Sequence, residues 1–152
     1  MYASIVKQII IMKKILYLIP LLLLTFLVQG ALAQSPVGKW RTIDDEEQGK
    51  EKSVVKLYEK DGVIYGVVEK LTDPKAKRIC DACSGDKKNK QIEGMQILWG
   101  LKKTGKEWGD GYILDPKNGK IYKARVWVEG QNLKVRGYIG PFFRTQTWYP
   151  VK

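Results

Sequence analysis

Apolar and polar side chains alternate in short runs through most of the chain after residue 34. Turn-forming residues separate these runs at about the 8–12-residue spacing typical of antiparallel sheets, and no long stretch has the 3.6-residue period of an amphipathic helix. The pattern predicts strands over residues 38–42, 53–59, 63–71, 107–114, 120–128, 132–139 and 144–151, and another within 92–101. About eight strands in a small domain favour an all-β fold with a single antiparallel β-barrel, since closure leaves no unpaired edge.

One predicted hairpin, residues 120–139, carries a turn that fixes its strand pairing. Gly130 stands at the first central position of a two-residue connection, which suits a type II′ turn. With that turn, one face of the hairpin is continuously apolar. On the other face Arg125 lies directly opposite Arg136.

The N-terminal segment has the pattern of a secretory signal peptide. Lys13 and Lys14 precede an apolar run over residues 15–28, and Ala31 and Ala33 have the A-x-A spacing that signal peptidase requires. The run is shorter than the roughly 20 residues that span a bilayer, so we expect cleavage near Ala33 rather than a retained anchor. The mature protein is then periplasmic or secreted, and it is not an integral membrane protein.

Cleavage divides the chain into a signal peptide, residues 1–33, and one domain, residues 34–152, whose length suits a single β-barrel. Met12 is followed directly by two lysines, which is a more usual start for an exported protein. Residues 1–11 are therefore interpreted as an upstream start-site artefact.

Charge and composition exclude several functions. The formal net charge of +11 comes mostly from scattered lysines, which indicates a solvated surface. An exported protein rarely meets nucleic acid, so we expect no nucleic-acid partner and a weak attraction to anionic headgroups or polymers. The chain has no histidine, which removes Ser-His and Cys-His nucleophilic pairs and ordinary histidine metal sites. We expect a protein that is not an enzyme and has no cofactor or metal.

Cys80 and Cys83 lie in the longest stretch without strand character, residues 72–91. In an oxidising compartment the pair predicts a local disulfide that pins this loop. A redox centre would place such a pair at the start of a helix after a buried strand, and the flanking sequence does not have that pattern. A redox role, a metal site and free thiols are the alternatives.

Arginines are few in this chain, five against 22 lysines, and three of them fall in the last three predicted strands beside aromatic residues. Guanidinium groups bind carboxylates and phosphates through two contacts at once and stack on aromatic rings. One hypothesis is therefore an anion-binding site with aromatic walls, formed by Arg125, Arg136, Arg144, Trp127, Tyr138 and Trp148. The alternative is an outer barrel face on which the arginines cover Trp and Tyr rings and pair with nearby acids.

Two short elements resemble the lipocalin and calycin superfamily: Gly38-x-Trp40 at the first strand and Arg144 in the last. In that group a Gly-x-Trp begins the barrel, and a late Arg packs across the Trp to close its base. The resemblance implies a lipocalin-like barrel in which Arg144 contacts Trp40.

A longer resemblance covers nearly the whole domain, from Gly38 to Tyr149. The chain is similar to a family of small exported bacterial proteins, domain of unknown function 2147. The matching segments are Gly38-Lys39-Trp40, Ser53-Val54-Val55, Ile79-Cys80-Asp81-Ala82-Cys83, Gly94-Met95-Gln96-Ile97-Leu98, residues 113–120 with Tyr122, residues 135–140 and residues 144–148. This resemblance implies export and a compact β domain, and it supplies no chemistry.

We therefore expect an exported β-barrel that binds a small amphipathic or anionic ligand, with the three arginines as polar anchors. The alternative is a non-enzymatic cell-envelope interaction or structural protein, whose basic face contacts a protein or an anionic polymer. A cavity of about 300 Å³ or more distinguishes the first function from the second.

Overall fold

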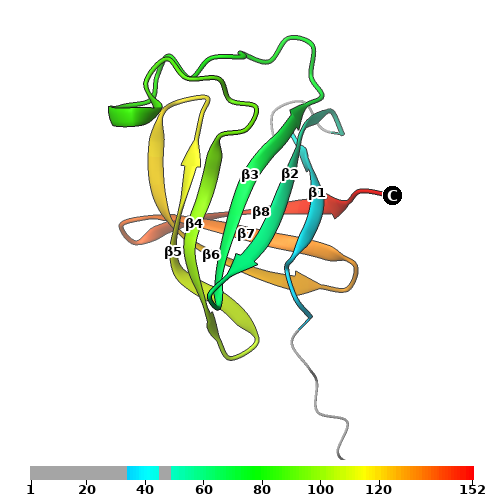
Figure 1. Cartoon of the computed structure of the whole chain (residues 1–152). Helices are drawn as coiled ribbons and strands as arrows, with labels where there is room; N and C mark the ends of the chain where they lie inside the picture. The colour runs from blue at the N-terminus through cyan, green and yellow to red at the C-terminus, as the bar shows by residue number, and fades with distance from the viewer. Residues whose placement is uncertain (1–33, 45–48) are drawn as a thin grey trace, which may run out of the picture. The chain divides into compact units, whose positions relative to one another are not determined.

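Eight antiparallel strands close into one barrel in the computed structural model, which describes residues 34–44 and 49–152 (Figure 1). Each strand pairs with the next along the chain, and β8 pairs with β1 to complete the ring. The strands are β1 Gly38–Ile43, β2 Glu51–Lys60, β3 Val63–Leu71, β4 Gln96–Thr104, β5 Glu107–Asp115, β6 Lys120–Glu129, β7 Asn132–Ile139 and β8 Phe142–Pro150. The predicted all-β barrel is confirmed, whereas the predicted signal peptide lies outside the described residues.

The strands follow the alternation of apolar and polar side chains, with bounds that differ from the predicted ones by a few residues. β4 starts at Gln96, inside the predicted range 92–101, and ends at Thr104, beyond it. Ile92 and Met95 give this segment its apolar character, but they bury their side chains from the preceding loop. No helix within the described residues has the length and apolar character that a bilayer crossing requires.

The pairing of β6 with β7 sets the faces of the last strands. Arg125 pairs with Arg136, and Val126 pairs with Val135, as the turn predicted. Gly130 has a φ of 62°, which the type II′ connection requires at its first central position. Because side chains alternate along a strand, the buried valines mark the inside of the barrel and the two arginines lie on its outside.

The two ends of the barrel differ in what fills them. The β2–β3, β4–β5 and β6–β7 turns lie at one end, which we call the closed end, and the β3–β4, β5–β6 and β7–β8 connections lie at the other, the open end. Large apolar side chains fill the interior toward the closed end, namely Trp40, Leu57, Ile64, Leu101, Trp108, Val126 and Leu133. Burial stabilises the fold by about 1.5–3 kcal/mol for each large side chain. The core continues from this end to the 72–95 connection, where Cys80, Cys83, Ile92 and Met95 are buried as well.

The connection between β3 and β4, residues 72–95, lies at the open end and contains the short 3-10 helix η2, Gly85–Lys87 (Figure 1). Cys80 and Cys83 form the predicted disulfide in this connection, with a Cα–Cα distance of 5.3 Å. Both cysteines are buried. Burial keeps the disulfide from reaction partners in solution, which favours the structural role over the redox alternative.

The disulfide-bearing segment packs directly on the β5–β6 turn. Gly119 in that turn has a φ of 70°, and a Cβ added there would lie 1.9 Å from the carbonyl oxygen of Ala82. Cys80 Sγ lies 3.5 Å from the carbonyl oxygen of Pro116 in the same turn. Glycine at position 119 is therefore required both by the backbone conformation and by the close approach of the loop.

Candidate ligand cavity

A cavity of about 680 Å³ occupies the interior at the open end of the barrel. Its wall is formed by the end of β1 and the start of β2, by the β5–β6 turn, and by the end of β7 and the start of β8. Small-molecule sites have volumes of about 300–1,000 Å³. The cavity therefore meets the size condition for a ligand-binding barrel.

The floor of the cavity is apolar. Val55, Ile97 and Val135 line it, and each of these side chains is buried. Trp148 lines it as well, and its Nε1 donates a hydrogen bond of 3.2 Å to Oε1 of Gln146. Because the indole N–H is already satisfied, Trp148 presents apolar surface to the cavity.

The charged and polar groups on the β1–β2 side of the cavity are paired with one another. Lys52 Nζ lies 3.3 Å from Oδ2 of Asp44. The hydroxyl groups of Thr42 and Ser53 are 2.8 Å apart and both side chains are buried. The ion pair offsets the positive charge of Lys52, so this side of the cavity attracts an anion weakly.

A hydrogen-bonded group of side chains lies on the β5–β6 side of the cavity. Asn118 Nδ2 donates to Oδ2 of Asp115 at 3.0 Å and to Oη of Tyr122 at 3.1 Å. Since the Tyr122 oxygen accepts from Asn118, its own O–H can donate to a group inside the cavity. All three residues line the cavity.

Arg144 is the only arginine among the described residues that line the cavity. The other four arginines also lie within the described part of the chain, and none of them lines the cavity. Its pairing partner on β7 is Gly137, and a Cβ added to Gly137 would lie 3.5 Å from the Cβ of Tyr122. The absent side chain leaves a gap on the wall between Tyr122 on β6 and Arg144 on β8. Tyr122 borders this gap with its Cβ and Cγ, and its hydroxyl lies beside Asn118 on the β5–β6 side.

The six residues predicted as an anion site do not lie on one face of the sheet. Arg144 and Trp148 line the cavity. The other four alternate with buried residues and point to the outside of the barrel: Arg125, Trp127, Arg136 and Tyr138. Side chains alternate between the two faces of a strand, so the inward pair and the outward four lie on opposite faces of the sheet. One ligand inside the barrel therefore cannot contact both groups.

The four outward residues form a surface cluster of their own. Arg136 Cζ lies 5.0 Å from the ring centroid of Trp127 and 4.3 Å from that of Phe143, and Arg136 Nε donates to Thr145 at 2.8 Å. Arg125 forms an ion pair of 3.0 Å with Glu107. These contacts match the alternative interpretation, an outer face on which arginines cover aromatic rings and pair with acids.

Two cavity residues, Tyr122 and Gly137, were not singled out from the sequence. The register of the 120–139 hairpin carries the signal for both, because it places them on the same face as Val126 and Val135. Extending that apolar face toward the open end locates them. The gap between them depends on β8, whose register the hairpin alone does not set.

The contact between Arg144 and Trp40 that the lipocalin resemblance implies is wrong for this chain. Trp40 pairs with Pro150, six residues along β8 from Arg144, which corresponds to about 20 Å of extended strand. Trp40 lies in the core, where its Nε1 donates to the carbonyl oxygen of Pro36 at 2.9 Å. Arg144 lines the cavity at the opposite end.

Two aspartates of the 72–95 connection have a lowered pKa. The N–H of Lys75 donates to Asp73 and holds the pKa of that carboxyl below its ordinary value of 3.8, with a further contribution from Lys50. The Lys77 ammonium lowers the pKa of Asp81 in the same way, through contacts of 2.7 and 3.0 Å. No cluster of His, Cys, Asp and Glu within the described ranges could hold a metal ion.

Comparison with known proteins places these features in a family. A family model described as "Uncharacterized protein conserved in bacteria (DUF2147)" matches residues 38–149. The chain belongs to the DUF2147 family. The matched region of this DUF2147 protein begins with β1 and ends within β8, so it contains the whole cavity.

A solved structure has the same fold. Protein HP1028 from the human pathogen Helicobacter pylori, described as belonging to the lipocalin family, is 22% identical and has a TM-score of 0.67. The similarity covers 78% of the DUF2147 chain and 84% of the other chain. A comparison with curated proteins found no match. The DUF2147 barrel is therefore lipocalin-like in fold.

Proposed function

We propose that this DUF2147 protein is exported and binds a small amphiphile with an anionic head group inside its barrel. The observation that carries the proposal is the gap between Tyr122 and Arg144, which adjoins an apolar floor. The signal-peptide pattern, the disulfide and the bacterial family support export. The lipocalin-like fold and the size of the cavity support ligand binding.

The floor accounts for the apolar part of the ligand. An acyl chain that enters from the open end meets Val55, Ile97, Val135 and the ring of Trp148. Each buried CH₂ group contributes about 0.8 kcal/mol, so an acyl chain of moderate length gives a measurable affinity without any polar contact. These floor residues offer the ligand no hydrogen-bond donor in a fixed direction, so they select a ligand by its apolar character and its size.

The rim accounts for the anionic head group. Arg144 offers two parallel N–H donors to a carboxylate or phosphate, and the Tyr122 hydroxyl, which accepts from Asn118, offers a third from the β5–β6 side. Lys52, on the opposite side, faces Asp44. We assign the head group to the β6–β8 side of the cavity, because a guanidinium binds an anion through two contacts at once.

Substitution of Arg144 tests this assignment. With cis-parinaric acid as a fluorescent probe, Arg144→Gln should weaken binding about 10–100-fold, since a hydrogen bond to a charged group contributes about 1.5–3 kcal/mol. Arg125→Gln, on the outer face, is the matched control and should bind the probe as the wild type does. Competition by dodecanoate and by 1-dodecanol separates charge from chain length. The wild type should prefer dodecanoate, and Arg144→Gln should lose that preference; an unchanged preference would contradict the proposal.

A further inference from the structure

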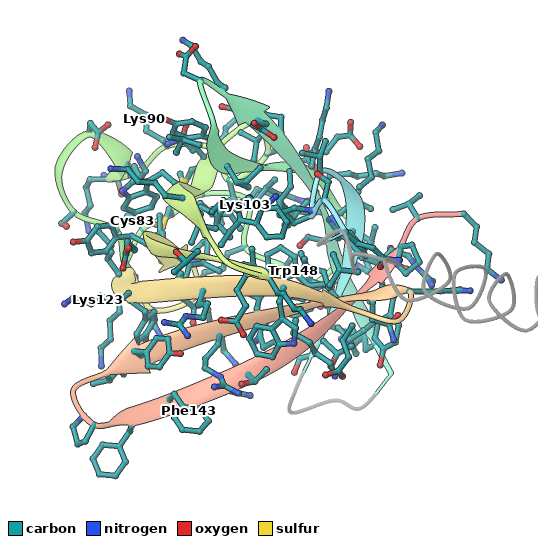
Figure 2. All side chains as sticks on the ribbon, turned by 90° about the horizontal axis from the view of Figure 1, so that it is seen from below. Cys83, Lys90, Lys103, Lys123, Phe143 and Trp148 are labelled. Atoms are coloured by element: carbon teal, nitrogen blue, oxygen red, sulfur yellow. A yellow bond between two sulfur atoms is a disulfide. The ribbon has the colours of Figure 1, made fainter. Side chains whose placement is uncertain are left out.

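Four exposed apolar side chains gather at one side of the cavity mouth. Ile139, Phe142 and Phe143 flank the β7–β8 turn, and Ile121 lies near the start of β6. Their exposed fractions are 57%, 75%, 59% and 54%, which makes them the four most exposed large apolar residues among those described. Figure 2 shows the β7–β8 hairpin projecting at the lower left, with Phe143 near its turn. We call these four residues the apolar tip.

The apolar tip is held in place by a short, stiff turn. Only Gly140 and Pro141 connect β7 to β8, and Gly140 has a φ of 52°. The Phe143 ring packs against Tyr138 with centroids 6.1 Å apart and beneath the Arg136 guanidinium. The turn and these contacts hold Phe143 in place, and the exposure of the tip is part of the folded structure.

The surface around the apolar tip is positively charged. Residues 115–150 contain seven basic residues and two acids. Asp115 pairs with Lys120 beside the β5–β6 turn, and Glu129 lies at the closed end beside Lys134. The exposed residues Lys117, Lys120 and Lys123 lie on the strand and turn next to the tip. In Figure 2 Lys123 lies on β6 toward the same end as Phe143. Asp44, by contrast, follows β1 on another side of the mouth.

We propose that the apolar tip and its neighbouring lysines dock the barrel on a bilayer that contains anionic phospholipid, with the cavity mouth at the lipid surface. Exposed aromatic and aliphatic groups flanked by lysines are the composition that enters the headgroup region of such a membrane. Ile139, Phe142 and Phe143 also line the cavity. The inference rests on the proposed function, because docking would serve ligand uptake. An amphiphile held in the bilayer would then reach the cavity without crossing water.

The charge around the tip favours a membrane over a second copy of the chain. A symmetric dimer through the tip would bring the lysines of two protomers together, and like charges in contact oppose association. An anionic polymer would use the lysines and leave the apolar tip unexplained. An anionic bilayer uses both features, since its headgroups attract the lysines and its interface accepts the aromatic rings.

Vesicle binding tests the inference with the ligand-free protein. The probes are vesicles of phosphatidylcholine alone and of an equimolar mixture with phosphatidylglycerol. The wild type should bind the mixed vesicles and bind those of phosphatidylcholine much more weakly. Phe142→Ser should weaken binding about tenfold through loss of apolar burial. The double variant Lys120→Gln/Lys123→Gln should weaken it about 25-fold, at about fivefold for each lysine near the surface.

Val151→Ser is the matched control, because Val151 is 40% exposed and follows β8 at the closed end. This variant should bind mixed vesicles as the wild type does. Absence of wild-type binding to the mixed vesicles would overturn the inference. So would equal binding by Phe142→Ser, which would indicate charge attraction alone, or a tip-dependent dimer in light scattering.

Failure of this inference can be told apart from failure of the proposed function. Lys120 and Lys123 do not line the cavity, so their double variant should bind cis-parinaric acid in lipid-free solution as tightly as the wild type. Conversely, a substitution that fills the cavity at Gly137 should weaken probe binding and leave vesicle binding intact. Each proposal thus has a variant that affects it alone.

Discussion

Gly137 is the position at which the cavity can be filled without strain, so Gly137→Val gives a sharp test of the interior. Its backbone φ is in the range that any residue adopts, and an added Cβ would make ordinary contacts with Tyr122 Cβ at 3.5 Å and Ile113 Cγ2 at 3.9 Å. The valine side chain would then project into the gap between Tyr122 and Arg144. Valine also suits a strand better than glycine does.

The expected result combines a gain in stability with a loss of binding. Full burial of a valine side chain stabilises a protein by about 1.5–3 kcal/mol. Valine at position 137 would be only about half buried, because it faces the open cavity, so we expect a gain of roughly 1 kcal/mol. For a domain of this size the Tm should rise by about 3–6 °C. A ligand that occupies the gap would meet the new methyl groups, and overpacking of about 1–3 kcal/mol weakens its binding by about 5–150-fold.

Thermal unfolding and cis-parinaric acid titration on the same samples measure both effects. Gly66→Ala is the contrasting variant, because its Cβ would lie 3.1 Å from Leu98 Cβ in the tightly packed core. It should lower the Tm and leave probe affinity unchanged. If Gly137→Val lowered the Tm and kept full probe affinity, the position would be packed rather than open, and the assignment of the gap as the head-group site would be refuted.

Two further predictions concern the connection that carries the disulfide. Gly119→Ala should destabilise the protein by about 1–3 kcal/mol in urea unfolding, because the residue has a φ of 70° and its Cβ would collide with the Ala82 carbonyl; wild-type stability would show that the loop does not rest on this turn. The Asp73 carboxyl should titrate by NMR with a pKa below 3.8. Because folding lowers this pKa, the stabilisation that Asp73 provides is present above pH 3.8 and is lost as the pH falls through the lower folded value. Amide exchange at Lys75 should accelerate over that acidic range, and a pKa at or above 3.8 would contradict the contact.

The barrel could be predicted from the sequence because each of its signals is local. Alternation along each strand and the glycine at position 130 determine which side chains face inward, and these depend on neighbours only a few residues away. Gly137 and Tyr122 lie on a face that this register already defines. Arg125 and Arg136 carry the stronger local signal, because arginines beside aromatic rings indicate anion binding more directly than an absent side chain does.

The cavity itself could not be predicted, because it depends on pairings between distant parts of the chain. The gap at Gly137 is bordered by Arg144 only through the β7–β8 register, and the floor combines Val55 of β2 with Trp148 of β8, which both line the cavity. The position of Arg144 relative to Trp40 depends likewise on the β1–β8 pairing, which no local pattern encodes. A family resemblance placed that arginine at the wrong end of the barrel.

The pairing of β1 with β8 has a consequence for engineering. Trp40 pairs with Pro150, and the N–H of Val151 donates to the carbonyl oxygen of Lys39 at 3.0 Å, so the first and last strands leave the barrel side by side at the closed end. A short linker could join these ends, and a new start could be opened at the tight turn between β2 and β3. Such a circular permutant would keep every wall of the cavity. It would also leave the open end clear for reporters attached at the opposite end.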